Sequence, residues 1–286
     1  MDEFWETNLI LRTLSGSRAH GLAREGSDTD TRGVCIPPAR VLIGLTQFEQ
    51  HESEGGDHVT YSLEKFVRLA LKGNPNIMES LYCHAEDFLF LTDAGRRILQ
   101  DRDCFLSKQV GQRFLGYALA QLKRMERHHR WLRSPPSCAP DPATYGAQEV
   151  GGRMRFPDAD QQKAHEADFK HWQHFKAWRR DRNPSRAALE EQYGYDTKHA
   201  MHLIRLLKMG DEVLTLGQVI VRRPDAEWLL GIRDGALEYV QLMELAARMT
   251  ATLERKLKTS QLSEHPDRAK AEGLLVELQL EALSRT

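Results

Sequence analysis

The sequence predicts an α+β protein in which a small mixed α/β domain, residues 1–104, precedes a mainly helical domain, residues 105–286. Two observations predict this organisation. Up to about residue 105, apolar runs of strand length alternate with short amphipathic segments. Beyond that point, apolar residues recur mostly at the three- and four-residue spacing of helices. A chain of 286 residues is long enough to form two such domains.

The first domain opens with an apolar strand and a glycine turn. Residues 9–14 are apolar and β-prone, and the run stops at Gly16. Asp28 and Asp30 are expected on a second extended segment, where a spacing of two residues places both carboxylates on one face. A third extended run, residues 57–61, leads directly into a helix. Helices are expected over residues 63–72, 77–82 and 94–102.

The second domain is expected to be a bundle of helices. Residues 109–133 form one long amphipathic segment. It ends at the proline-rich stretch 134–142, which cannot continue a helix and is predicted to be an exposed loop. Residues 214–221 are expected to form a β-hairpin or an extended link before Pro224. Further helices are expected over residues 160–182, 197–209, 226–233, 237–257 and 268–283.

Charge and cysteine content narrow the class of protein. The chain has 40 Lys plus Arg and 41 Asp plus Glu, so its overall charge gives no sign of a nucleic-acid partner. Its four cysteines form no Cys-x-x-Cys pair, which favours free thiols in a reducing compartment over a disulfide framework or a zinc site. The N-terminus lacks an apolar signal stretch, and no apolar run approaches the ~20 residues of a membrane span. We therefore expect a soluble, cytoplasmic protein with no membrane partner.

One segment combines a glycine-serine turn with two carboxylates. Gly16 can turn the backbone close to a ligand, and Ser17 can offer its hydroxyl and N–H groups to phosphate oxygens. Asp28 and Asp30 would repel each other unless a cation lay between them, and Mg²⁺ prefers such oxygen ligands. Each feature alone occurs by chance in many loops. Their order and spacing, between two strand-like runs, favour a catalytic metal site.

The Gly-Ser turn followed by Asp-x-Asp resembles the signature of the DNA polymerase β superfamily of nucleotidyltransferases. More narrowly, the chain resembles the RNA-ligase-associated nucleotidyltransferases, the RlaP or YcgL-like family. Four stretches carry this resemblance, residues 16–21, 27–34, 73–81 and 195–207. It implies a polymerase β-like palm followed by a C-terminal helical bundle. It also implies transfer of an NMP from an NTP to an acceptor hydroxyl, with release of pyrophosphate and two Mg²⁺ (or Mn²⁺) ions.

The resemblance implies a third carboxylate on a neighbouring strand, and Asp57 is chosen for it. This residue opens the extended run before the helix at residue 63. It could also be a turn residue after two glycines. Glu49, Glu52 and Glu54 are the alternatives, interpreted as solvated charges of a hairpin.

The implied chemistry assigns a role to each group. Asp28 and Asp30 would hold the ion that bridges the triphosphate and share the second ion. Asp57 would complete the acceptor-side ion and help to deprotonate the hydroxyl. Ser17, with the turn at Gly16, would bind the β- and γ-phosphates of the NTP, for which ATP is favoured. Arg18 is predicted to contribute to nucleotide binding, although an arginine beside a turn is as often simply exposed.

A basic stripe is predicted on the helix over residues 197–209. Lys198, His202 and Arg205 follow one another at spacings of four and three residues, which suits an anionic ligand. Lys198 and His202 are predicted to bind nucleotide in a cleft facing Gly16. The alternative is a solvated basic face beside the core. His199 lies about 100° from Lys198 around the helix, so its place in the site is less certain.

Two middle helices, around residues 109–133 and 163–182, interleave basic residues with aromatic ones. Such a surface could follow a phosphate backbone and stack on bases, which makes RNA a possible acceptor, with an RNA ligase as a possible partner. Equally, the aromatic residues could form a core. Arg124 and His129 match an Arg-x4-His spacing of some helical ribonucleases, interpreted as a chance match. The alternative functions are an antitoxin-type nucleotidyltransferase that AMPylates a protein and a non-catalytic nucleotide- or RNA-binding module.

Overall fold

The computed structural model describes residues 3–285. The chain forms two compact units: the first combines the residues up to Ala120 with those from Met201 onward, and the second spans Gln121–Ala200. The first unit contains a mixed β-sheet and helices, so the structure confirms the α+β class. The predicted division into a mixed α/β domain, residues 1–104, and a mainly helical domain, residues 105–286, stays a prediction. No helix among residues 3–285 is long and apolar enough to cross a membrane.

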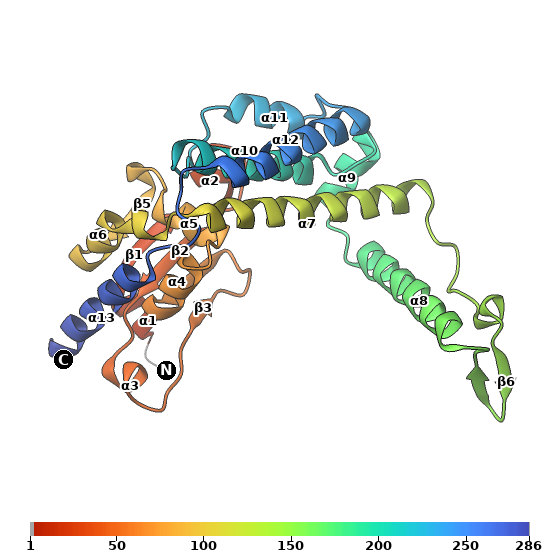
Figure 1. Ribbon diagram of the computed structural model, residues 1–286, viewed down its shortest axis with the longest axis horizontal. Coiled ribbons are helices and arrows are strands. Elements are labelled where there is room, and N and C mark those ends of the chain that lie inside the picture. The colour runs from red at the N-terminus through yellow and green to blue at the C-terminus, as the bar shows by residue number, and fades with distance from the viewer. Residues whose placement is uncertain (1–2, 286) are drawn as a thin grey trace. The chain divides into compact units, whose positions relative to one another are not determined.

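The sheet of the first unit has five strands in the order β3-β4-β2-β1-β5 (Figure 1). β2 and β4 pair in parallel, and the other neighbouring strands are antiparallel. Leu11 of β1 and Val34 of β2 are buried, which anchors the centre of the sheet in the core. The strands are β1 Leu9–Leu14, β2 Thr31–Cys35, β3 Gln50–Glu52, β4 His58–Ser62 and β5 Phe88–Leu91.

Three capped helices follow these strands, close to the predicted positions. The side chains of Ser62, Asn74 and Thr92 each accept a hydrogen bond from a backbone N–H of the first helical turn. Phe66 and Ile77 are completely buried on the inner faces of the first two helices. The helices are α4 Leu63–Ala70, α5 Pro75–Leu81 and α6 Asp93–Gln100, and the shorter segments are α1 Phe4–Thr7, α2 Gly16–Ala19, α3 Ala39–Leu42, η1 Ala85–Asp87 and η2 Arg102–Phe105.

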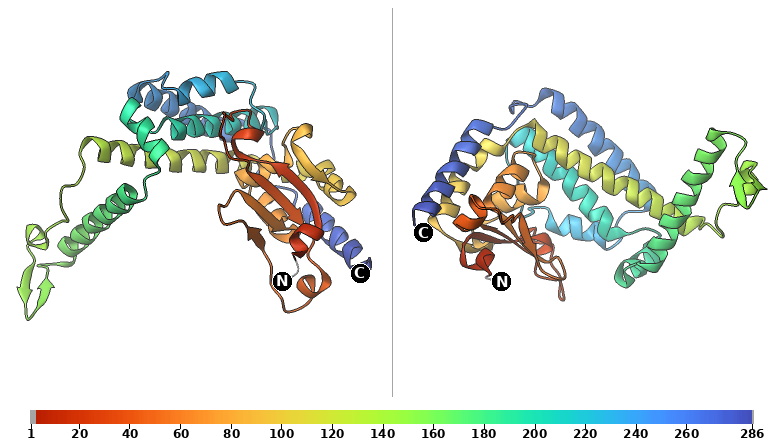
Figure 2. Two further views of the ribbon diagram at one scale, coloured as in Figure 1. Left: turned by 180° about the vertical axis from the view of Figure 1, so that it is seen from behind. Right: turned by 90° about the horizontal axis from the view of Figure 1, so that it is seen from below.

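The later residues of the first unit are helical, and the view from below in Figure 2 shows the start of α7 running alongside α10 and α12. Gly210 of α10 lies so close to its neighbours that a Cβ would be 3.0 Å from Leu253 and 3.1 Å from Phe114. Glycine therefore allows close helix packing at this position. The helices are α10 Thr197–Leu216, α11 Ala226–Arg233, α12 Tyr239–Thr259 and α13 Arg268–Ser284, and α7 Lys108–Arg133 begins in this unit.

The second unit has an aromatic core. Trp131 and Phe175 are 3 % and 4 % exposed, and their ring centroids lie 5.7 Å apart. The core interpretation of the interleaved aromatic residues is therefore correct for these two. The unit contains the end of α7, η3 Pro142–Tyr145, the hairpin β6 Gln148–Val150 and β7 Arg153–Arg155, α8 Ala159–Arg180, and α9 Pro184–Tyr193.

The prediction of a hairpin or extended link over residues 214–221 is wrong at its start. α10 continues to Leu216 and stops at Gly217, whose φ of +64° suits a glycine. Val219 and Val221 are buried without belonging to a strand, which explains the β-like apolar pattern. The sequence also failed to predict α9 and the β6–β7 hairpin.

Candidate functional site

The predicted acidic residues lie where the three central strands β1, β2 and β4 begin or end. This end of the strands is called the sheet edge below. Leu14, the last residue of β1, is opposite Thr31, the first residue of β2, and Thr31 is opposite His58 at the start of β4. Asp30 and Asp57 each directly precede one of these paired positions. The Thr31 N–H donates to the Asp57 carbonyl at 2.8 Å, so the backbone ladder holds Asp57 beside the start of β2.

The turn after β1 is closely fitted to Asp30. Gly16 has φ of +60°, and a Cβ at this position would lie 2.1 Å from the Asp30 Oδ2 atom. The Ser15 N–H also donates to the Asp30 carbonyl at 2.9 Å. Only glycine combines this backbone conformation with so close a carboxylate. Ser17, the next residue, lies partly exposed in α2.

Arg18 binds the loop that carries Asp28. Its Nη2 donates to the Ser27 carbonyl at 2.9 Å, and its Nε donates to the Asp28 carbonyl at 3.3 Å. The guanidinium is exposed, as the simpler interpretation of this arginine expected. Its predicted contact with nucleotide stays a prediction.

Asp28 and Asp30 do not lie on a strand, contrary to expectation. Residues 27–30 are irregular, because pairing with β1 and β4 begins only at Thr31. Asp28 is exposed, whereas Asp30 and Asp57 are partly buried. Among residues 3–285, no three or more His, Cys, Asp or Glu side chains converge closely enough to hold a metal ion.

The donor chemistry at this edge nevertheless fits Mg²⁺. Asp28, Asp30 and Asp57 supply only carboxylate oxygens, the ligands that hard divalent ions prefer. Asp30 packs in the cradle that Gly16 leaves open. The role of these three residues as metal ligands stays a prediction.

The alternative acids are less well placed. Glu49 accepts from Lys65 Nζ at 2.8 Å and also pairs with Arg68, and both hydrogen bonds lower the pKa of its carboxyl group. Glu52 lies exposed on β3, and Glu54 is exposed in the following turn. β4 is the strand that pairs with β2 in parallel, and only Asp57 directly precedes it. The register therefore favours Asp57 over the three glutamates.

A buried polar cluster, His20, Glu79 and Arg205, was not assigned from the sequence. Arg205 Nη1 donates to Glu79 Oε1 at 2.7 Å and lies 2.5 Å from His20 Nε2. His20 Nδ1 is 3.0 Å from the Val221 carbonyl, which can only accept, so this nitrogen carries a proton. The three residues are 2 %, 8 % and 8 % exposed.

Glu79 is ionised in this cluster. Burial alone would raise its pKa, but the charges of Arg205 and His20 and their hydrogen bonds outweigh burial and hold the pKa well below its ordinary value. An unpaired buried charge would be costly, so each member depends on the others. Arg205 is consequently buried, where the basic-stripe prediction expected a group facing a cleft.

A model of the RNA repair pathway DNA polymerase beta family (RlaP) matches residues 2–277. The chain belongs to this family. The RlaP resemblance of the four sequence stretches is thereby confirmed.

The chain is also similar to one curated protein of Enterobacteria phage T4, the "Uncharacterized 38.9 kDa protein in nrdC-mobD intergenic region". The two are 28% identical over 128 residues, which cover 40% of this chain and 38% of the phage protein. The match thus spans less than two thirds of that relative's length. No solved structure matches the chain.

The buried cluster joins three of the four stretches that carry the resemblance to the RlaP family. His20 lies in residues 16–21, Glu79 lies in residues 73–81, and Arg205 lies in residues 195–207. The only sign of this cluster in the sequence was that each of three separate motifs contains a basic or an acidic residue. Pairing them required the fold, because His20 and Arg205 are 185 positions apart.

Lys198 and His202 both lie on α10, but in different compact units. Lys198 belongs to the second unit and His202 to the first, and both are partly buried. Both make contacts within the structure. Their binding of nucleotide stays a prediction.

Proposed function

We propose that this RlaP-family protein is a metal-dependent nucleotidyltransferase that moves an NMP from an NTP, with ATP favoured, to a hydroxyl at an RNA end. Pyrophosphate leaves, and the reaction serves RNA repair or tRNA metabolism. Membership in a polymerase β-like RNA repair family supports this kind of chemistry. The single observation that carries the site is the Asp30 carboxylate packed on Gly16, with Asp57 beside it in register.

The proposed roles follow from the charges that the reaction develops. Asp28, Asp30 and Asp57 would hold Mg²⁺ or Mn²⁺, which when bound would stabilise charge on the attacking and leaving oxygens. Asp57 accepts the proton of the acceptor hydroxyl. Ser17 and the backbone at Gly16 bind the terminal phosphates, with Arg18, Lys198 and His202 supplying positive charge. We assign residues 1–104 to the catalytic palm and residues 105–286 to the helical domain, with an RNA ligase as a partner.

An acceptor survey tests this proposal. The protein is incubated with each α-labelled NTP, Mg²⁺ or Mn²⁺, and parallel RNA and protein acceptors. We expect label on RNA with the wild type and none with Asp30→Asn, because an amide cannot supply the charge that holds the ion. Asp160→Asn, at an exposed position in the first turn of α8, is the matched control and should remain active.

Other outcomes would replace the proposal. Label on protein alone would establish an AMPylating enzyme. No label on any acceptor, with nucleotide binding retained, would indicate a non-catalytic binding module. Transfer by Asp30→Asn at the wild-type rate would remove the sheet edge from the reaction.

A further inference from the structure

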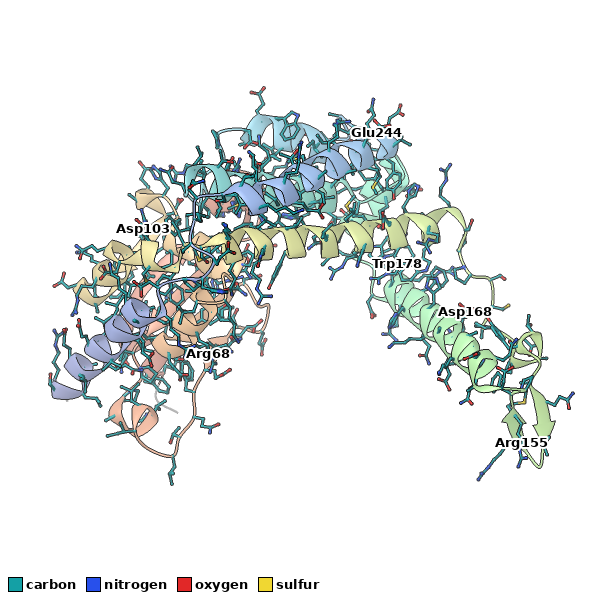
Figure 3. All side chains as sticks on the ribbon, viewed as in Figure 1. Arg68, Asp103, Arg155, Asp168, Trp178 and Glu244 are labelled. Carbon is teal, nitrogen blue, oxygen red and sulfur yellow. The ribbon has the colours of Figure 1, made fainter. Side chains whose placement is uncertain are left out.

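The second unit contains a hollow that the proposed transfer site does not use. Its volume is about 370 Å³, and its lining comes entirely from residues 124–199 of this unit. Small-molecule sites commonly occupy roughly 300–1,000 Å³. Arg124, Arg127 and His128 of α7 contribute one side, and Trp178 of α8 contributes another. Figure 3 marks Trp178 near the C-terminal end of α8.

The floor of the hollow is a set of ion pairs between buried carboxylates and partly exposed arginines. Arg182 Nε donates to Glu190 Oε2 at 2.7 Å, and Arg186 Nη1 donates to Asp196 Oδ2 at 3.3 Å. His199 Nδ1 lies 2.8 Å from the same Asp196 oxygen. Burial would raise the pKa of Asp196, but the His199 hydrogen bonds and the nearby cations lower it to about 2. Asp196 is therefore ionised, whereas burial raises the pKa of Glu190 despite its pairing with Arg182. The hydrogen bonds to these two acids hold Arg182 and Arg186 in place.

The rim of the hollow carries unneutralised positive charge. Arg124 and Arg127 are three residues apart on α7, so they lie on the same face of the helix. Neither has a carboxylate partner among the described residues, 3–285. The lining contains one further carboxylate, that of Asp181. It accepts two hydrogen bonds from the Arg180 guanidinium, at 2.7 and 2.9 Å. Two guanidinium groups thus remain available for an anion.

The wall of the hollow is aromatic. Trp178 is partly exposed, unlike the buried Trp131, and the Arg182 guanidinium lies over its ring at 5.0 Å. The His128 ring lies 5.3 Å from Trp178, between centroids. Burial, with positive neighbours, lowers the pKa of His128 to about 4, so this side chain is neutral at pH 7. An aromatic wall that stacks with one guanidinium group, beside a cationic rim, matches a base attached to a phosphate.

We propose that this hollow binds one nucleotide unit of RNA, with its phosphate at Arg124 and Arg127 and its base against Trp178. A terminal nucleotide of RNA and a free nucleoside monophosphate share this chemistry. The site is separate from the sheet-edge carboxylates, so the proposal does not depend on transfer activity.

Fluorescence anisotropy of a labelled single-stranded RNA of about ten nucleotides measures this binding. The test variant is Arg124→Gln/Arg127→Gln. The matched control is Arg130→Gln/Arg133→Gln, which removes the same charge from exposed positions of α7 outside the lining. We expect about tenfold weaker binding for the test variant and less than about twofold for the control, because counterion release alone would affect both alike. Thermal melts of both variants establish that they fold.

Competitors identify the part of the ligand that is bound. AMP should displace the RNA at lower concentration than inorganic phosphate or adenosine, since only AMP offers both phosphate and base. Trp178→Leu should reduce this advantage of AMP over inorganic phosphate.

Three outcomes would overturn the proposal. Equal weakening by the two double variants would leave only non-specific attraction. Displacement of the RNA by polyglutamate as effective as displacement by AMP would indicate an acidic protein as the ligand instead of RNA. RNA binding lost in Asp30→Asn but retained in Arg124→Gln/Arg127→Gln would place the nucleotide at the sheet edge. Binding lost only in Arg124→Gln/Arg127→Gln supports the proposal, even if the transfer assay fails.

Discussion

The two compact units carry opposite charges at their candidate sites. In the first unit, the sheet edge carries three exposed or partly exposed carboxylates, those of Asp28, Asp30 and Asp57, beside the Arg18 guanidinium. In the second unit, the carboxylates of the hollow are buried, and guanidinium groups at Arg124 and Arg127 form its rim. An acidic edge favours metal cations, and a cationic rim favours phosphates. This contrast is the reason why we propose a metal site in the first unit and a nucleotide site in the second.

The two sites also differ in what positions them. Backbone hydrogen bonds hold Asp30 and Asp57 in position. A side-chain substitution at either residue is therefore expected to change the activity with little change in the fold. The hollow depends on side-chain ion pairs, such as the one between Arg182, in the loop after α8, and Glu190 of α9. We therefore expect substitutions at the sheet edge to separate activity from stability more cleanly than substitutions in the hollow floor.

The largest expected effect on stability concerns Glu79. Glu79→Gln leaves Arg205 buried without a carboxylate and should lower the free energy of unfolding by about 3–5 kcal/mol, measured by denaturant titration. Glu64→Gln, at a surface ion pair of α4, is the control and should change it by less than about 1 kcal/mol. Similar unfolding midpoints for both variants would mean that the cluster does not hold the first unit together.

Asp57 should separate turnover from binding. Asp57→Asn is expected to lower kcat about a hundredfold, which corresponds to about 2.7 kcal/mol, with little change in NTP affinity. Its backbone carbonyl would still accept from Thr31, so the fold is preserved. Unchanged kcat would transfer the role of third acid to Glu49, Glu52 or another residue.

Gly16 should be intolerant of any side chain. Gly16→Ala places a methyl group within 2.1 Å of Asp30 in a strained conformation, which costs about 1–3 kcal/mol. Gly21→Ala has a similar φ of +70° but an open environment, so it reports the backbone strain alone. We expect transfer activity to fall much further for Gly16→Ala than for Gly21→Ala. Equal losses would show that contact with Asp30 is unimportant.

The smallest expected effect is a pH dependence that differs between the units. The pKa of His128 is lowered from 6.5 to about 4 by burial and neighbouring cations, so the unfolded chain takes up this proton first. His128 therefore reduces stability as the pH falls from about 6.5 towards 4. Glu79, whose pKa is lowered, contributes stability that is complete above its unfolded pKa of about 4.3 and is lost at lower pH. In thermal melts between pH 7 and 4.5, His128→Gln should flatten the decline, and Glu79→Gln should not.

Local motifs made the sheet edge largely predictable. The strand before Gly16, the Asp-x-Asp pair and the run after Asp57 each lie within a few residues of the feature that identifies them. The sequence did not show that Asp28 and Asp30 precede their strand, because strand pairing decides where β2 begins.

Long-range contacts explain what the sequence could not predict. Glu79 and Arg205 are 126 positions apart, and no periodicity links them. The hollow likewise combines α7 with residues that follow α8, so its basic residues had the same appearance as a solvated face. Val219 and Val221 resembled a strand because they are apolar, yet they are buried in a segment that belongs to no strand.

Metal binding at the sheet edge tests the central claim most directly, because it requires no acceptor. Mn²⁺ bound in the presence of a non-hydrolysable ATP analogue can be measured from the loss of the free-ion electron paramagnetic resonance signal. We predict about tenfold or greater loss of Mn²⁺ affinity for Asp28→Asn and for Asp30→Asn, with wild-type affinity for Asp160→Asn, because each amide removes a charged oxygen ligand. Wild-type Mn²⁺ affinity in both edge variants would contradict the assignment of this edge as the catalytic metal site.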